Sequence, residues 1–63
     1  MDVRTKDSRR GVDAKDVWID GVFRGAVFPR HRGGYVAVTA SGVRADHLFA
    51  GIDDAANWLF IHR

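Results

Sequence analysis

The chain has 63 residues, ten lysines and arginines, eight acidic residues and no cysteine. Its length leaves room for one domain with a small core, and the lack of cysteine excludes disulfides and thiolate zinc sites. No apolar run is long enough to span a membrane and the N-terminus lacks the apolar stretch of a secretory signal, so we expect a cytoplasmic protein.

The first fifteen residues mix basic and acidic side chains with few apolar ones. Such a segment gains little by burying one face, and chain ends are often poorly ordered. We therefore predict a flexible charged tail over residues 1–15 and a single domain over residues 16–63.

From Val17 onward, short apolar runs alternate with glycine-containing turns, which is typical of antiparallel strands. The predicted turns are Asp20-Gly21, Gly33-Gly34 and Ser41-Gly42. The predicted strands are Val22–Pro29, Tyr35–Ala40 and Val43–Phe49. Asp20-Gly21 is either a hairpin turn that follows a short edge strand at Val17–Ile19 or a bulge in one longer strand.

Alternation along these strands assigns side chains to the two faces of the sheet. The residues predicted to face the core are Phe23, Val27, Val36, Val38 and Ala40. The opposite face then carries Arg24, Tyr35 and Thr39.

Residues 51–63 form the clearest predicted helix. Ile52, Ala55, Ala56 and Leu59 recur at helical spacing, and small alanines allow close packing on a sheet. The predicted fold is therefore α+β: an antiparallel β-meander of three, or four, strands packed on one C-terminal α-helix.

A second apolar group on this helix, Trp58 and Ile61, falls on the side opposite the core stripe. One interpretation is that the segment Val17–Ile19 folds across it and Trp18 packs against Trp58. The other is that Trp58, Ile61 and Trp18 bind a protein partner or a second copy of the chain.

Residues that would support catalysis or metal binding are few. His31, His47 and His62 lack the close spacing of metal ligands, and neither Ser8 nor Ser41 has a recognisable nucleophile context. We therefore expect a protein that is not an enzyme and that uses neither a metal nor another cofactor.

The distribution of charge points to an anionic partner. No acidic residue lies between Asp20 and Asp46, and a basic surface of this kind attracts the phosphates of nucleic acids. An ordinary solvated surface is the alternative. The residues predicted to contact DNA are Arg24, Arg30, Arg32, Tyr35, Thr39 and Arg44.

Four segments also resemble a known family. They are Phe23-Arg24-Gly25-Ala26, Gly34-Tyr35-Val36-Ala37, Gly42-Val43-Arg44 and the run from Leu48 to Ala56. Together they resemble the plant ethylene-response-factor DNA-binding domain, and the similar arm-site-binding domain of tyrosine-recombinase integrases, over about residues 22–60.

The resemblance implies a three-stranded sheet backed by a helix, with Arg24, Tyr35 and Arg44 contacting DNA. The chain departs from the plant family at Val27 and Pro29, where that family carries further arginines. The predicted function is a small non-enzymatic protein that docks the exposed face of its sheet on duplex DNA. The alternative is a protein-interaction module of phage or mobile-element type, a homodimer or an inhibitor, that uses the apolar helix surface.

Overall fold

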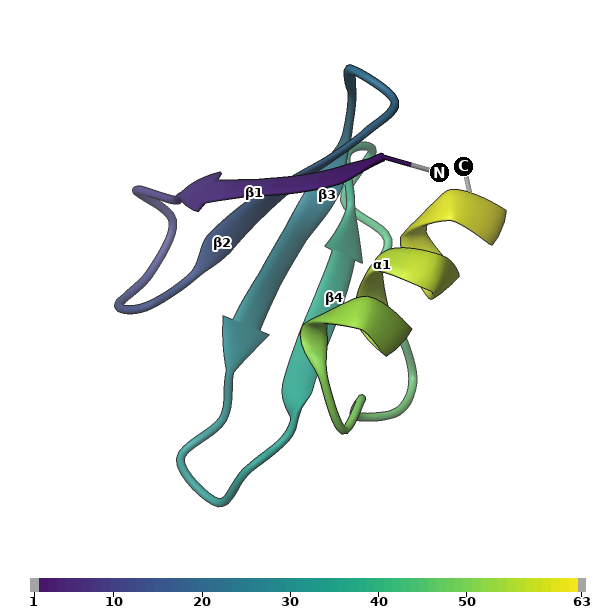
Figure 1. Cartoon of the computed structure of the whole chain (residues 1–63). Helices are drawn as coiled ribbons and strands as arrows, with labels where there is room; N and C mark the ends of the chain where they lie inside the picture. Colours follow the sequence, from purple (N-terminus) through teal and green to yellow (C-terminus); the bar gives the residue numbers. More distant parts are fainter. Residues whose placement is uncertain (1, 63) are drawn as a thin grey trace.

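The computed structural model describes residues 2–62, which form one antiparallel sheet and one helix (Figure 1). The strands lie in the sheet in chain order, as in a meander, and the helix packs on one face. The predicted α+β class, an antiparallel β-meander packed on one C-terminal α-helix, is confirmed, but its four strands are not the four predicted ones, because Val3–Asp7 forms a strand and Val43–Phe49 does not. The elements are β1 (Val3–Asp7), β2 (Lys15–Ile19), β3 (Val22–Pro29), β4 (Tyr35–Thr39) and α1 (Ile52–Ile61).

The flexible tail predicted over residues 1–15 is wrong for the residues of β1. This strand pairs with β2 from Val3 opposite Ile19 to Asp7 opposite Lys15. Val3 packs against the core, and the backbone N–H and C=O groups of β1 form hydrogen bonds with β2. The composition of residues 1–15 does not predict this pairing. Met1 and Arg63, at the two ends of the predicted segments, lie outside the described residues.

The connection between β2 and β3 is a two-residue hairpin turn. Asp20 and Gly21 have φ angles of 52° and 80°, and Ile19 pairs with Val22 directly across them. Positive φ at both central residues is the signature of a type I′ turn, which matches the twist of the two strands. The hairpin interpretation is therefore confirmed, and Gly21 does not form a bulge.

A bulge lies instead at Arg24, in the middle of the hairpin formed by β2 and β3. Val17 pairs with Gly25 and Trp18 with Phe23, so Arg24 has no counterpart on β2. An extra residue reverses the alternation on one side of it. Phe23 consequently faces away from the helix, and the prediction that it shares the buried face with Val27 is wrong.

The segment predicted as a strand at Val43–Phe49 is irregular. It follows the outer edge of β4 and forms only isolated bridges, Tyr35 with Phe49 and Val38 with Arg44. Backbone hydrogen bonds of 2.8–2.9 Å join these residues, including one from Ala45 N to Ala37 O. The segment therefore covers the edge of β4 without continuing the sheet as a regular strand.

The core lies between α1 and the sheet. Ala55, Ala56 and Leu59 are fully buried against Ala37 and Val27, as the helical spacing predicts for this face of the helix. The orientation predicted for the strand Tyr35–Ala40, which is β4 in the structure, is inverted, however. Ala37 faces the helix, and Val36 and Val38 face away from it. The small Ala37 side chain leaves room for the helix to lie close to the sheet.

Gly25 permits the closest approach within this core. Its φ is +148°, and a Cβ atom placed on it would lie 2.1 Å from the carbonyl oxygen of Val38 and 3.1 Å from Leu59 Cδ2. Only glycine fits this position in β3. Within residues 2–62, no helix has the length and apolar character needed to cross a membrane.

Candidate nucleic-acid interface

The open face of the sheet, which points away from α1, has an apolar and aromatic centre. Strands β2, β3 and β4 each contribute to it, because alternate residues of these strands face the core. The residues at its centre are Trp18, Phe23, Ala26, Phe28, Val36 and Val38. The three aromatic side chains among them are partly exposed.

Two aromatic rings of the open face, those of Trp18 and Phe23, each have a cationic side chain above them. The Trp18 and Phe23 rings lie 5.5 Å apart at 58°. The Lys6 ammonium lies 5.7 Å from the Trp18 ring centroid, and the Arg10 guanidinium lies 5.3 Å from the Phe23 ring centroid. Both cation–ring pairs are at a distance that favours a cation–π interaction.

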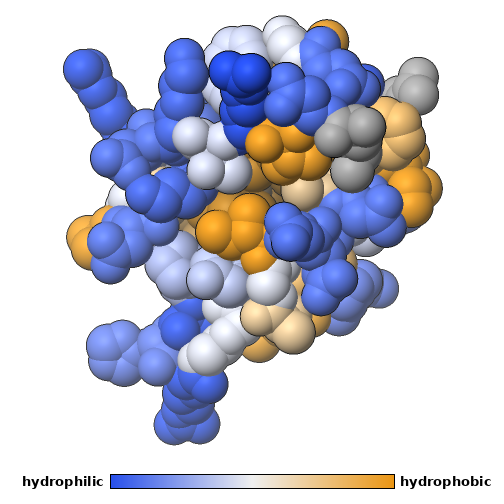
Figure 2. All heavy atoms as spheres, viewed as in Figure 1, coloured by the Kyte–Doolittle hydropathy of each residue, from blue (hydrophilic) through white to orange (hydrophobic). Residues whose placement is uncertain are grey.

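Basic side chains surround this centre, and we call them the basic rim. Two come from β1, one from the β1–β2 loop, one from the residue that follows β3 and one from the segment that follows β4: Arg4, Lys6, Arg10, Arg30 and Arg44. On the side of the molecule that Figure 1 presents, Figure 2 shows hydrophilic side chains projecting around smaller apolar areas. Two carboxylates, Asp2 and Asp16, lie beside rim side chains.

Both of these carboxylates pair with the rim. Arg4 Nε donates to Asp2 Oδ2 over 3.1 Å, and Arg10 Nε lies 3.5 Å from Asp16 Oδ1. The Arg4 and Asp2 side chains are 77% and 61% exposed. Exposed pairs contribute only up to about 1 kcal/mol to stability. A phosphate can therefore replace a carboxylate at low cost.

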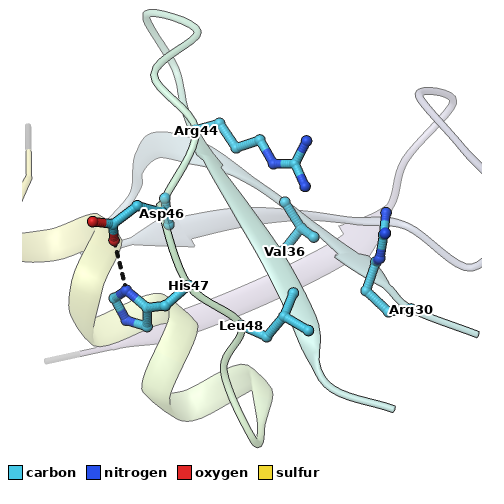
Figure 3. A pocket seen from close by; sticks show the side chains of 7 residues that line it. Arg30, Val36, Arg44, Asp46, His47 and Leu48 are labelled. Carbon is cyan, nitrogen blue, oxygen red and sulfur yellow. Dashed lines mark hydrogen bonds and ion pairs between the residues drawn. The ribbon is translucent and has the colours of Figure 1, made fainter. Parts of the chain in front are cut away.

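A hollow of about 360 Å³ opens between two arginines of the rim, Arg30 and Arg44. Val36 and Leu48 lie between them (Figure 3). Two guanidinium groups over an apolar floor suit an anionic group attached to an apolar or planar one.

Two further residues of this hollow turn away from the arginines. A hydrogen bond of 2.9 Å joins His47 Nδ1 to Asp46 Oδ1 (Figure 3). This hydrogen bond, together with one from the backbone and the charge of His47, lowers the pKa of the Asp46 carboxyl. The Asp46 charge is therefore partnered by His47 rather than by the rim arginines.

The β3–β4 hairpin continues the basic surface beyond the hollow. Arg32 is exposed in the loop, and hydrogen bonds from Arg30 N to Gly34 O and from Gly33 N to Arg30 O, both of 3.0 Å, close this loop. His31 and Arg32 line a second hollow that shares Arg30 and Leu48 with the first. Three of the predicted DNA contacts are therefore placed around the two hollows: Arg30 lines both, Arg44 lines the first and Arg32 lines the second.

The other three predicted contacts are not on the open face. The bulge turns Arg24 toward α1, where its guanidinium lies 5.9 Å from the ring centroid of Phe60. Thr39 is 7% exposed, and its hydroxyl accepts a 2.9 Å hydrogen bond from Val43 N. Tyr35 packs against the core from the helix side. The predicted common exposed face of Arg24, Tyr35 and Thr39 is thus wrong, since alternation was counted in the wrong phase.

The predicted partner-binding residues are also separated. Trp18 lies on the open face beside Phe23. Trp58 lies on α1, stacked on His62 with 4.5 Å between ring centroids and packed against the core, so it does not meet Trp18 as predicted. Ile61 is 64% exposed near the end of α1. The partner surface is reduced to Trp58 and Ile61, and it stays a prediction.

Residues that the sequence reasoning missed now define much of the interface. Lys6 and Arg4 are two residues apart in β1, a spacing that places them on one face of a strand. The sequence contains this spacing, but residues 1–15 were predicted to form a flexible tail and not a strand. Phe23 had no such signal, because the bulge that exposes it depends on pairing with β2.

Comparisons with family models, with curated proteins and with solved structures found no significant match. The resemblance to the ethylene-response-factor domain stays a prediction. Two of the three DNA contacts that it implies, Arg24 and Tyr35, lie on the helix side of the sheet. Among residues 2–62, no three histidine or acidic side chains gather in a way that would hold a metal ion.

Proposed function

We propose that this protein binds DNA through the open face of its sheet. The observation that carries the proposal is the basic rim, five cationic side chains around a partly exposed aromatic centre. Phosphate neutralisation by lysine and arginine supplies most of the sequence-independent affinity for nucleic acids. Aromatic side chains add contacts with bases and sugars.

The remaining carboxylates support this choice of face. Asp7 pairs with Lys15, on the helix side of the sheet. The hydrogen bond and charge of Asp7 raise the pKa of Lys15, and Asp13, in the β1–β2 loop, lies close enough for its charge to add to this effect. Asp20 lies in the hairpin turn, and Asp53 and Asp54 lie in the first turn of α1. The five rim cations therefore outnumber the carboxylates beside them, Asp2, Asp16 and Asp46, and a polyanion that approaches the open face meets net positive charge.

A pair of lysines offers a matched test. Lys6 lies on the open face over Trp18, whereas Lys15, on the neighbouring strand, pairs with Asp7 on the opposite face. Lys6→Gln and Lys15→Gln remove the same charge from the whole protein. Binding of a fluorescently labelled oligodeoxynucleotide, followed by anisotropy over a range of salt concentrations, compares the two variants with the wild type.

We expect binding that weakens steeply with salt. Lys6→Gln should lower the affinity severalfold and reduce the log–log salt slope by about 0.7 to 0.9, the loss of one phosphate contact. Lys15→Gln should leave the slope unchanged. No binding at low salt, or an equal loss in both variants, would contradict docking through the open face.

A further inference from the structure

We infer that the DNA held by the open face is single-stranded and that its unpaired bases stack on Trp18 and Phe23. This inference rests on the proposed function and adds the strand state of the ligand. It differs from the sequence-based expectation of duplex DNA, because the residues at the centre of the face are not those that the sequence placed there.

The centre of the open face suits the flat faces of bases. A duplex presents phosphates and base edges, while the flat faces of its bases are stacked inside. Aromatic side chains bind the flat faces, which only unpaired bases expose. Trp18 and Phe23 pair across β2 and β3 with 5.5 Å between their ring centroids, whereas the Phe28 ring lies beside Gly11 of the β1–β2 loop. Trp18 and Phe23 therefore form a platform of two rings on which neighbouring bases can stack.

Two of the rings have cations of their own. The Lys6 ammonium lies over the Trp18 ring, and the Arg10 guanidinium lies over the Phe23 ring. Both cations are carried on long side chains, which can move aside when a base takes their place on the ring. Each cation then remains beside the base that displaced it, near the phosphate of the same nucleotide.

Asp16 separates base contacts from phosphate contacts. It lies two residues before Trp18 on β2, and its carboxylate repels any phosphate at the centre of the face. Its Oδ1 is buried without a hydrogen bond from the part of the chain that the structure describes, since Arg10 Nε is too distant at 3.5 Å. The rim of cations therefore suits phosphates, and the centre of the face is left to the bases.

The two tryptophans allow a direct test of stacking. In Trp58→Phe, Trp18 is the only indole, and in Trp18→Phe, Trp58 is the only indole. Each variant is titrated at low salt with an unlabelled mixed-sequence single strand and with the matching duplex. Competition against a labelled single strand gives the affinities of the wild type, Trp18→Tyr and Trp18→Leu. Circular dichroism shows whether each variant keeps its fold.

We expect the single strand to quench Trp18 fluorescence and to leave Trp58 fluorescence unchanged. The single strand should bind about tenfold more tightly than the duplex. Trp18→Leu should weaken single-strand binding about tenfold, while Trp18→Tyr, which keeps a ring, should retain most of the affinity.

The outcomes separate this inference from the proposed function. Equal or tighter binding of the duplex, with unquenched Trp18, would overturn single-strand stacking and leave DNA binding by the open face intact. Salt-insensitive binding, or none of either ligand, would overturn both. If Trp18→Leu loses its fold, the quenching in Trp58→Phe and the affinity of Trp18→Tyr still decide the matter.

Discussion

The two faces of the sheet differ in how they use their side chains. On the helix side, small or fully buried residues such as Ala37 and Val27 pack against α1, and Gly25 allows backbone and helix to approach closely. On the open face, larger rings such as Trp18 and Phe23 stay partly exposed, with cations above them. One face of this short sheet thus packs against the helix while the other stays partly exposed, and one extra residue in β3 decides which side chains lie on which face.

The largest expected effect on stability comes from a substitution on the helix-covered face of the sheet. A Cβ atom at Gly25 would lie 2.1 Å from Val38 O, at a φ of +148°. We expect Gly25→Ala to lower the free energy of unfolding by more than about 4 kcal/mol, because strain and a backbone clash add together. In a domain of this size such a loss removes most of the stability, which thermal unfolding followed by circular dichroism measures.

Gly42→Ala is the matched control for that substitution. Gly42 also has a positive φ, +96°, but a Cβ atom there meets open space. Its cost should be only about 1 kcal/mol, the cost of the backbone conformation alone. Similar losses in the two variants would mean that the close approach at Gly25 does not matter.

A smaller effect on the free energy of unfolding is expected in β1, at the edge of the sheet. Val3 packs against the core from the helix side, whereas Thr5, on the same face of the same strand, is exposed. We expect Val3→Asp to cost about 2 kcal/mol, since it places a charge beside apolar side chains, and Thr5→Asp to cost much less. Urea unfolding of both variants measures the difference. If residues 1–15 formed a flexible tail, both substitutions would be neutral.

The smallest expected effect concerns the ion pair on the helix side of β1 and β2. A hydrogen bond from Lys15, and its charge, lower the pKa of Asp7 below 3.8. The same hydrogen bond with Asp7 raises the pKa of Lys15 above 10.5. Because the Asp7 side chain is 91% exposed and the Lys15 side chain 37% exposed, solvent screens the pair and its effect on unfolding is small.

The pH dependence of this pair has a defined sign. Its contribution is complete above the ordinary pKa of Asp7 and disappears as the pH falls through the lowered one. It is likewise complete below the ordinary pKa of Lys15 and disappears as the pH rises through the raised one. Titration of the Asp7 carboxyl by NMR should show its pKa returning toward 3.8 in Lys15→Gln. An unchanged pKa in that variant would refute the pairing.

Much of the fold could be predicted because its signals are local. The dipeptide Asp20-Gly21 tolerates positive φ at both residues, and the structure has the type I′ turn there. The spacing of Ala55, Ala56 and Leu59 defines one helix face, and these residues are the buried ones. Each signal depends on residues within about one turn of helix or hairpin, so no knowledge of the partner strand is needed.

The candidate site could be predicted only in part. Arg30 and Arg44 were identified from an interval without acidic residues, and both line the hollow. Arg24 and Thr39 were assigned to the open face by counting alternate residues, and both assignments failed. When the count is shifted by one residue, every side chain of the strand is assigned to the wrong face of the sheet.

The sequence by itself determined the order of the turns, the helix and its buried stripe, because these follow from backbone preferences and periodicity within short segments. Only the tertiary structure decided that β1 joins the sheet, that Val43–Phe49 stays irregular, and that Arg24 is the extra residue of a bulge. These features depend on which backbone groups of distant segments find partners. That pairing fixes the phase of each strand, and with it the side chains that lie on the open face.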